Sequence, residues 1–415
     1  MFLSKKHPNL VSIKIQKSSS NDSTLSQLLS LPNIRIIHLE KCAIKGNDLS
    51  VPDKVQQLEE LSLQSSFLTH RGFFNICSNI NTDSLSVLDL TYITFVNAST
   101  YTCTFSGLKL LRLKTFGGDV DNAIVDLLNR IGPSLMELEI SCKVATLSNI
   151  EDMTCSFPKL KLMRLNCPAL TDLGLVRLCN RIGLQLEQLV LRSNAVTLSN
   201  IEDMTCSFPK LKLMELICPA LTDFGLVRLC NKVGQQLEDL GIQSKVTLSD
   251  IEDMTCSFPK LKLLELSCPA LTDLGLVGLC NRIGQQLEDL RLFQCEIVAL
   301  SNIEDMTCSF PRLKLMWLLC PAITDIGLAG LCNKVGPQLE ELKIMSNVTL
   351  NNLEDMTCIF PMLEVLEIRD SNISATNLIA FIRKICINLE RLVFDQEIEL
   401  ATLQVEFPRL ALKQM

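Results

Sequence analysis

Five Glu-Asp pairs are the first residues in this sequence whose type and spacing could do chemistry. They stand at 151/152, 202/203, 252/253, 304/305 and 354/355, within copies of the segment IEDMTCSFP or its variant LEDMTCIFP. Paired carboxylates can act as general acid and base when their pKa values are driven apart. Each pair also falls in the first turn of a short predicted helix, where the helix dipole favours negative charge. We therefore interpret the pairs as structural and predict that the chain is not an enzyme.

Basic residues form a second regular series, at 159/161, 210/212, 260/262 and 312/314. Such a series could contact phosphates, but binding to nucleic acid generally needs a basic surface. The formal net charge is −7 and the pI is near 5.3. We expect these side chains to be solvated charges at an edge of the fold, with no nucleic acid as partner.

Cysteines and histidines are the residue types that could act as metal ligands or nucleophiles. The 19 cysteines form no CxxC pair, and only His7, His38 and His70 are present, so no repeated Cys-His or Ser-His arrangement exists. No glycine-rich phosphate loop occurs either. Many cysteines recur in register, for example Cys167, Cys218, Cys268 and Cys320, which suggests small buried thiols in a reducing compartment. We predict no catalytic residue, metal, cofactor or small-molecule substrate.

The elements that position these residues follow from a repeat. The pattern Leu-x-x-Leu-x-Leu recurs every 23 to 27 residues, within the 20 to 29 expected of leucine-rich repeats. Its sixteen copies begin at Leu10, Ile34, Leu58, Leu85, Leu108, Leu135, Leu160, Leu186, Leu211, Leu237, Leu261, Leu287, Leu313, Leu339, Leu363 and Leu389. A chance match would not keep phase over so many copies.

Alternation within the motif predicts a short strand. Its fourth and sixth positions, such as Leu264 and Leu266, point into a core, while positions three, five and seven point the other way. Stacked in parallel, the strands would line a concave face, and the rest of each repeat would return over a convex face. The predicted fold is an α/β leucine-rich-repeat solenoid, or horseshoe, of about sixteen repeats.

Two kinds of return segment alternate between the strands. In PALTDLGLVRLCNRIG the apolar residues have helical spacing, Thr171 can cap the helix and Gly183 can end it. The other segment, TLSNIEDMTCSFP, contains a possible capping box formed by Ser199 and Glu202, which predicts a shorter helix.

We predict one solenoid over residues 1–415. Residues 1–150 hold divergent repeats, 151–362 hold near-identical two-repeat units, and 363–415 hold divergent C-terminal repeats, the last one incomplete. Neither end shows a polar capping unit, so we expect a fragment or a solenoid capped by a partner. No signal-peptide core and no run of 18 apolar residues occurs, so we expect a cytoplasmic or nuclear protein with no membrane partner.

The phrase CPALTDLGLVGLC at 268–280, preceded by LKLLELS and followed by QLEDLRL, resembles the cysteine-containing class of leucine-rich repeat. That class is common in F-box proteins, where the solenoid presents substrates to an SCF-type ubiquitin ligase. The resemblance implies a substrate-recognition role, with the ligase reached through an F-box. Here the cysteine follows the strand one residue early, alternate repeats carry the IEDM return, and residues 1–50 contain no F-box.

The near-identical repeats serve as an internal alignment that locates a binding surface. In LKLMRLNCPALTD, LKLMELICPALTD, LKLLELSCPALTD and LKLMWLLCPAITD the non-conservative changes fall at positions five and seven. A copied framework with variable outward side chains suggests a surface tuned for recognition, although drift at solvated positions is the alternative. The partner-binding residues predicted on the concave face are Arg164, Arg192, Glu215, Ile217, Glu265, Arg291, Phe293, Leu315, Trp317, Leu319, Lys343 and Met345.

One part of that surface is chemically distinctive. Neighbouring strands lie about 4.8 Å apart, so Phe293, Leu319 and Met345 should form a row on three successive strands. Trp317, the only tryptophan, should be exposed between Arg291 and Lys343, which can pack on its ring. Leu315 lies beyond it. We predict an interface hot spot here, unless a C-terminal segment or a second molecule covers it permanently.

The function predicted from the sequence is therefore protein binding on the concave face, and the resemblance implies that the chain is the substrate-recognition part of an SCF-type ligase adaptor. Two alternatives stay open. One is a fragment of a ligand-sensing receptor of immune type, and the other is a regulator of a small GTPase or a nuclease.

Overall fold

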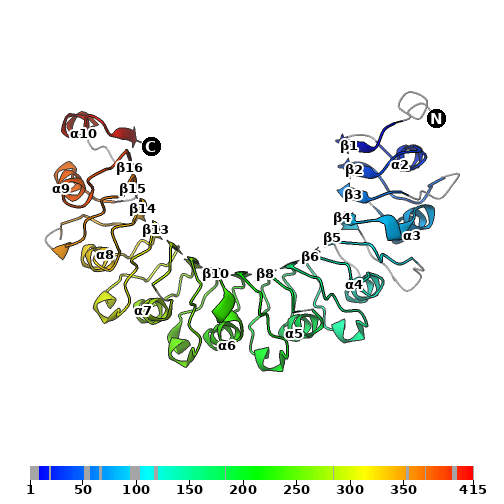
Figure 1. The fold of residues 1–415 in the computed structure, drawn as a ribbon, viewed down its shortest axis with the longest axis horizontal. Coiled ribbons are helices and arrows are strands. Elements are labelled where there is room, and N and C mark those ends of the chain that lie inside the picture. The colour runs from blue at the N-terminus through cyan, green and yellow to red at the C-terminus, as the bar shows by residue number, and fades with distance from the viewer. Residues whose placement is uncertain are drawn as a thin grey trace. The chain divides into compact units, whose positions relative to one another are not determined.

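The computed structural model describes residues 9–17, 20–50, 57–64, 68–93, 103–115, 120–182, 184–283, 285–351, 355–369, 371–394 and 400–414. His7, Gly183 and Glu354 of the fifth Glu-Asp pair lie outside these ranges. The chain forms two compact units, residues 1–196 with 200–211, and residues 197–199 with 212–415. Strands alternate with helix-bearing return segments in both units (Figure 1).

In the first unit each strand pairs in parallel with the next along the chain. The strands are β1 (Ser12–Gln16), β2 (Ile36–Glu40), β3 (Glu60–Gln64), β4 (Val87–Ile93), β5 (Leu110–Thr115), β6 (Glu137–Cys142), β7 (Leu162–Asn166) and β8 (Gln188–Arg192). The return segments carry α2 (Asp22–Leu29), α3 (His70–Asn79), α4 (Val120–Leu128) and α5 (Asp172–Arg181), with 3-10 turns η1 (Thr82–Ser84), η3 (Ile150–Asp152) and η4 (Ile201–Asp203).

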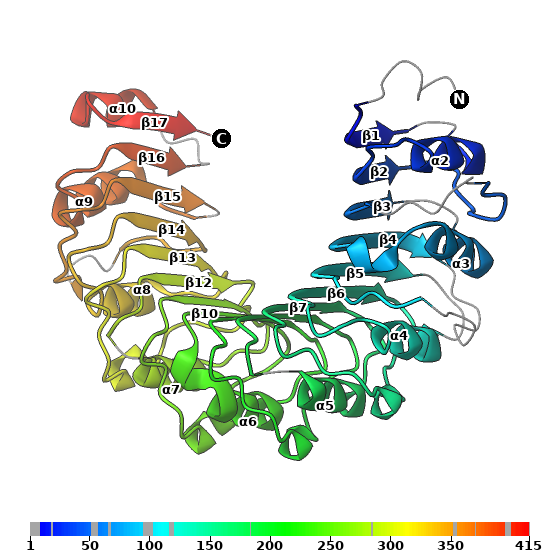
Figure 2. The same cartoon turned by 45° about the vertical axis from the view of Figure 1, so that its right-hand side comes forward.

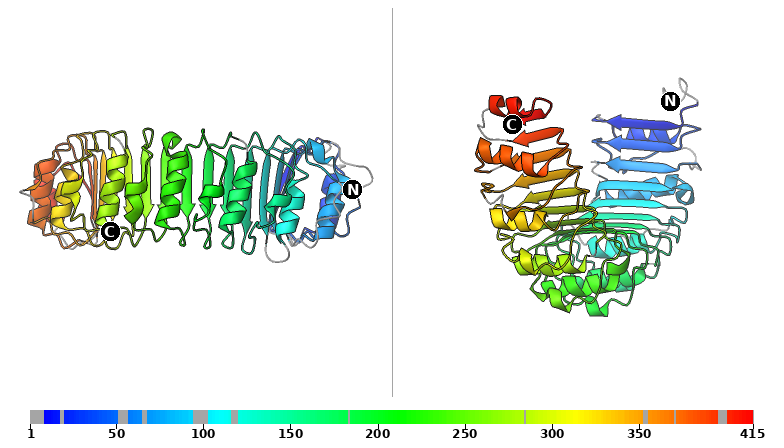
Figure 3. Two further views of the ribbon diagram at one scale, coloured as in Figure 1. Left: turned by 90° about the horizontal axis from the view of Figure 1, so that it is seen from below. Right: turned by 60° about the vertical axis from the view of Figure 1, so that its left-hand side comes forward.

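The second unit repeats this plan, again with parallel pairing between consecutive strands. Its strands are β9 (Leu213–Ile217), β10 (Asp239–Gln243), β11 (Leu263–Ser267), β12 (Asp289–Phe293), β13 (Leu315–Leu319), β14 (Glu341–Met345), β15 (Val365–Arg369), β16 (Arg391–Phe394) and β17 (Ala411–Gln414). Between them lie α6 (Asp223–Val233), α7 (Asp273–Arg282), α8 (Asp325–Cys332), α9 (Ala375–Ile385) and α10 (Leu400–Glu406), and the 3-10 turns η5 (Gly234–Gln236), η6 (Ser249–Asp253) and η7 (Ile303–Asp305). The strands form one layer and the helices another (Figures 2 and 3).

The core lies between these two layers. The fourth and sixth motif positions are buried as predicted, for example Leu264 and Leu266 on β11, and the first leucine of each copy, such as Leu261, is buried with them. Phe258 and its equivalents Phe310 and Phe360 are fully buried beside them. The chain is therefore a leucine-rich-repeat solenoid in both units, and the predicted fold class is confirmed. We call the side of the strands formed by positions three, five and seven the sheet face.

The returns that carry α5, α6, α7 and α8 begin with the residues Thr-Asp-x-Gly, and each of the three fixed residues has a separate task. The Thr272 hydroxyl accepts a hydrogen bond from the Gly275 backbone N–H at 3.1 Å and so caps α7, as predicted for the equivalent Thr171. A Cβ on Gly275 would lie 2.3 Å from the Thr247 backbone oxygen, so the packing of helix on loop requires glycine.

The aspartate of this motif ties α6, α7 and α8 to the return that follows each of them. The Asp325 carboxylate accepts hydrogen bonds from the backbone N–H groups of Thr349, Leu350 and Asn351, at 2.8 to 3.1 Å. It also accepts from the Thr349 hydroxyl at 2.5 Å. Asp223 makes the same set of contacts with residues 247–249. These bonds join neighbouring repeats, which explains why the aspartate is copied between them.

The second kind of return differs from the sequence prediction. A single 3-10 turn, η4, replaces the predicted shorter helix, and its N-cap is Asn200, which makes no side-chain cap, in place of the predicted Ser199. The Ser199 backbone N–H instead donates to the Thr197 hydroxyl. In the equivalent segment of the second unit Leu248 is left-handed, with φ of +59°, and the turn ends as Met254 becomes extended. One turn is enough to bury Ile251 and Met254, so a longer helix is not needed.

Candidate functional site

The site predicted around Trp317 is carried by β12, β13 and β14 of the second unit. Leu290, Leu292 and their equivalents anchor these strands in the core, and this turns positions three, five and seven to the sheet face. The strands are in register, with Arg291 opposite Trp317 and Trp317 opposite Lys343. Phe293 lies opposite Leu319. The predicted row of side chains at position seven is therefore present, and Arg291 and Lys343 lie on either side of Trp317 as expected.

Trp317 is enclosed by three side chains. The Arg291 guanidinium carbon lies 4.4 Å from the centre of the indole ring, and the Lys343 Nζ lies 3.9 Å from it. The Phe293 ring meets the indole edge to face, with centroids 6.2 Å apart. Trp317 is consequently half-buried, whereas the sequence predicted an exposed ring. Its Nε1 is buried without a hydrogen-bond acceptor among the described residues, so the indole is held by ring contacts alone.

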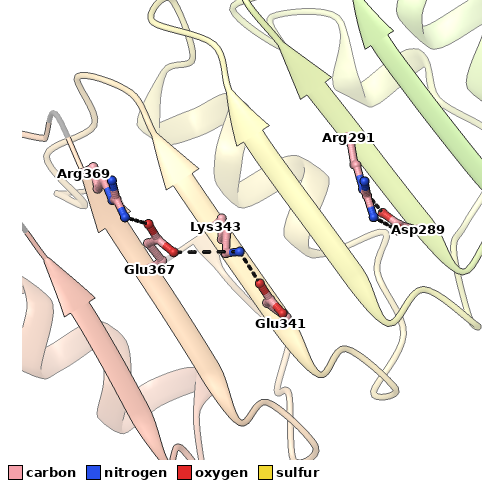
Figure 4. Close-up of polar contacts among 6 residues, drawn as sticks. All are labelled: Asp289, Arg291, Glu341, Lys343, Glu367 and Arg369. Carbon is pink, nitrogen blue, oxygen red and sulfur yellow. Dashed lines mark hydrogen bonds and ion pairs between the residues drawn. The ribbon is translucent and has the colours of Figure 1, made fainter. Parts of the chain in front are cut away.

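The cations on the indole are also bound to carboxylates, as Figure 4 shows. Arg291 donates from Nη2 and Nε to the Asp289 carboxylate, at 2.7 and 3.0 Å, and its Nη1 lies 3.6 Å from Glu265. The hydrogen bonds to Asp289 make the largest contribution, and together with the contact to Glu265 they raise the pKa of Arg291. The guanidinium is therefore fixed in place over the ring and stays charged.

Lys343 belongs to a second group of ion pairs on the same face (Figure 4). Its Nζ lies 2.6 Å from the Glu341 carboxylate and 3.9 Å from that of Glu367, which also binds Arg369. Asp289, Glu341, Glu367 and Arg369 were not among the predicted site residues. Asp289 and Glu341 occupy motif position three, which also faces outward, and Glu367 and Arg369 lie in the next repeat. Extending the internal alignment to that position and that repeat would have found them.

Apolar side chains complete the surface. Phe293, Leu319 and Met345 are all half-buried at position seven of three successive strands, and Leu315 is half-buried at position three of β13. We call Arg291, Phe293, Leu315, Trp317, Leu319, Lys343 and Met345 the Trp317 patch. It combines an apolar side with a side of paired charges.

The other predicted site residues lie outside the Trp317 patch. Glu265 contacts the patch through its ion pair with Arg291. Glu215 and Ile217 lie on β9 of the same unit, opposite Gly241 and Gln243 of β10. Arg164 and Arg192 lie on β7 and β8 of the first unit, where they face Val190 and Asn166 respectively. All of these side chains belong to the sheet face of their own unit.

The in-register cysteines lie in the surroundings of structural thiols, within the core. Cys167, Cys218, Cys268 and Cys320 are buried, and so are the helical Cys179, Cys230, Cys280 and Cys332. Burial raises the pKa of Cys167 and Cys268 to about 12. A thiol of this kind is protonated at neutral pH and is a poor nucleophile. In the described part of the chain no three His, Cys, Asp or Glu side chains are grouped as metal ligands.

Together these observations define a leucine-rich-repeat protein with a tryptophan-centred patch on its sheet face. No protein-family model matches the sequence, and no curated protein matches it. Its fold is similar to solved structures at low sequence identity. Rad7 of yeast, in a complex with Elc1, is 16% identical, with 99% of this chain and 85% of that chain covered and a TM-score of 0.41.

Two bacterial proteins give comparable values. An internalin from Listeria monocytogenes is 15% identical over 92% of this chain and 87% of its own, with a TM-score of 0.46. A leucine-rich-repeat protein of Leptospira interrogans is 15% identical over 98% of this chain and 90% of its own, with a TM-score of 0.44. Among the described residues, the helices are all too short or too polar to cross a bilayer.

Proposed function

We propose that this chain is a protein-binding scaffold whose partner docks on the sheet face over the Trp317 patch. The observation that carries the proposal is the arrangement of Trp317 between Arg291 and Lys343 with Phe293 at its edge. Tryptophan and arginine are among the residues enriched in the hot spots at the centres of protein interfaces. Covering a large apolar side chain contributes about 1.5 to 3 kcal/mol, and this patch offers several together.

The paired charges make the patch suitable for burial. An unpaired charge is costly to bury, but Arg291 and Lys343 already have carboxylate partners. A partner can cover them without leaving a charge unsatisfied. The same pairs hold the two cations in position before binding, which reduces the entropy lost on association.

A photocrosslinking experiment tests this proposal. A photoreactive amino acid is placed at Leu319, inside the patch, or at Leu274, which is 63% exposed on the helical layer of the same unit. We expect specific crosslinks to a cellular protein from position 319 and none to that protein from position 274. Trp317→Ala combined with Phe293→Ala should abolish the crosslink in a chain whose circular dichroism is unchanged. Equal crosslinking from both positions would contradict the assignment.

On the sequence resemblance to F-box repeat domains, we propose further that the bound protein is a substrate of an SCF-type ubiquitin ligase. The crosslinked protein should then be ubiquitylated and decline in abundance in cells that produce this chain fused to an F-box, and Trp317→Ala should prevent both effects. A bound GTPase or nuclease whose rate changes would instead favour the regulator. A stable complex with a ligand and no change in its turnover would favour the receptor.

A further inference from the structure

A regular series of charges follows one edge of the second unit. It consists of the second motif residues, which we call the edge ladder: Lys212, Glu238, Lys262, Glu288, Lys314, Glu340, Glu364 and Glu390. Lysine and glutamate alternate as far as Glu340. Lys212 and Lys262 each lie 3.7 Å from Glu238, and Lys314 lies 3.5 Å from Glu340. Neighbouring repeats are thus balanced in charge along this edge.

The alternation ends at the repeat that contains β15. Glu364 stands where the preceding copies of this return have Lys212, Lys262 and Lys314. Glu364 and Glu390 directly precede the neighbouring strands β15 and β16, are both exposed, and have no ion pair within the described ranges. Two like charges at adjacent positions are unfavourable in the isolated chain. Their placement therefore needs an explanation other than stability.

Two further changes in the same copy add apolar surface. Ile359 replaces the serine of SFP, and Met362 replaces the basic residue found as Lys260 or Arg312. Ile359 is 54% exposed and Met362 47%, and Ile387 before β16 is 68% exposed. All three lie in the loops that enter β15 and β16. Because parallel strands begin at one edge of a sheet, these residues lie at the same edge as the two carboxylates.

A groove lies between these loops. It has a volume of about 770 Å³ and is lined by Met362, Glu364, Asn388, Leu389, Glu390 and Arg409. The Asn388 side chain donates to the Pro361 carbonyl at 2.7 Å, and the Phe360 backbone N–H donates to the Ile385 carbonyl at 2.8 Å. These bonds hold the two loops together, so the groove is preformed. A second hollow of about 260 Å³, lined by Ile387 and Phe407, shares Leu389 and Arg409 with it.

We propose that this corner, formed by the loops entering β15, β16 and β17, binds an extended peptide segment of a partner protein that carries a lysine or arginine beside an apolar side chain. The basic group would meet Glu364 and Glu390, and the apolar side chain would cover Met362 and Ile387. The Arg409 guanidinium can donate to carbonyl oxygens of the segment. This surface is separate from the Trp317 patch and does not depend on the function proposed for it.

The test starts from a random 12-residue peptide library displayed on phage and selected on the full chain. Phage that also bind a Met362→Lys/Glu364→Lys variant are removed. This variant only restores residues that other copies carry, so we expect it to fold, and circular dichroism checks this. The surviving peptides should share a basic residue next to an aliphatic or aromatic one. A fluorescent synthetic copy should bind the intact chain roughly ten-fold or more tighter than the variant, since a charge-assisted contact is lost.

A matched control makes a charge change of the same size and sign elsewhere. Leu274→Lys/Glu252→Lys exchanges two exposed residues of the same unit, on α7 and η6, and peptide affinity should be unchanged. Enrichment of acidic peptides, no enrichment, or equal loss of affinity in both variants would overturn the proposal. So would a dimer of the intact chain, seen by analytical ultracentrifugation, that dissociates in the Met362→Lys/Glu364→Lys variant, because the corner would then bind a second copy.

Discussion

Two pairs of neighbouring strands in the second unit share a framework and differ in their surface. On β10 and β11 the fifth and seventh positions are Gly241 with Gln243 and Glu265 with Ser267, whereas on β12 and β13 they are Arg291 with Phe293 and Trp317 with Leu319. Both pairs are parallel, in register and buried at positions four and six. The framework is therefore set by the core and by bonds between returns, and the sheet face can change its chemistry independently.

The largest effect should come from breaking the framework at a helix start. In Gly275→Ala the new Cβ would lie 2.3 Å from the Thr247 carbonyl oxygen, a backbone atom that cannot move aside. We expect a loss of about 2 to 3 kcal/mol in the free energy of unfolding, as for other overpacked sites. Thermal unfolding followed by circular dichroism measures it.

Gly241→Ala is the matched control on the sheet face. Its Cβ would lie 3.7 Å from the Glu215 Cγ, an ordinary contact, so stability should change by no more than about 0.5 kcal/mol. An equal loss in both variants would show that glycine at any position is needed, and the distinction between framework and surface would fail.

Acid titration should separate two aspartates of the second unit. Burial alone would raise the pKa of Asp325, but hydrogen bonds from Thr349, Asn351 and Leu350 outweigh it and lower the pKa in the fold. The stability from Asp325 is thus present above the unfolded pKa of about 3.9 and is lost as pH falls through the lower folded value. Asp325→Asn should lower the free energy of unfolding by about 1 to 2 kcal/mol at pH 7. It should also make the free energy of unfolding less dependent on pH in the acid range.

Asp239 on the sheet face should behave in the opposite way. Burial and the nearby charge of Glu238 raise its pKa, so its ionisation opposes folding above the folded pKa and this penalty disappears as pH falls. Asp239→Asn should therefore leave the chain equally or slightly more stable at pH 7, by denaturant titration. A loss of stability similar to that of Asp325→Asn would contradict the assigned roles.

The sequence specified the framework because repetition supplies its own alignment. The register of Leu290 with Met316 and the cap at Thr171 follow from period and residue type alone. The 3-10 turn at Ile201–Asp203 could not be predicted in this way, because the local signals for a helix start are the same whether the segment continues for one turn or three. The half-burial of Trp317 and the Asp289 contact depend on long side chains from different strands, whose rotamers no periodicity encodes.

The cation pair over the indole can be tested through fluorescence, because Trp317 is the only tryptophan. Lys343→Met removes a contact of 3.9 Å and one charge, so acrylamide should quench the emission more efficiently. The stability change should be small, about 0.5 to 1 kcal/mol, as for exposed cation–π pairs. Lys262→Met, on the edge ladder, should leave quenching unchanged. Unaltered quenching in Lys343→Met would mean that the lysine does not cover the ring.

The smallest effect expected is on the cysteines, whose chemistry contrasts with that of the sheet face. Burial raises the pKa of Cys167 in the first unit and Cys268 in the second to about 12, and that of the half-buried Cys155 and Cys308 to about 11. Since the thiolate is the nucleophile, N-ethylmaleimide at pH 7.5 should label all four slowly in the folded chain and quickly in denaturant, as measured by mass spectrometry of peptides. Rapid labelling of Cys155 and Cys308 in the native state would show that these thiols are activated. The regular cysteines would then be a chemical feature of the repeat and not only part of its packing.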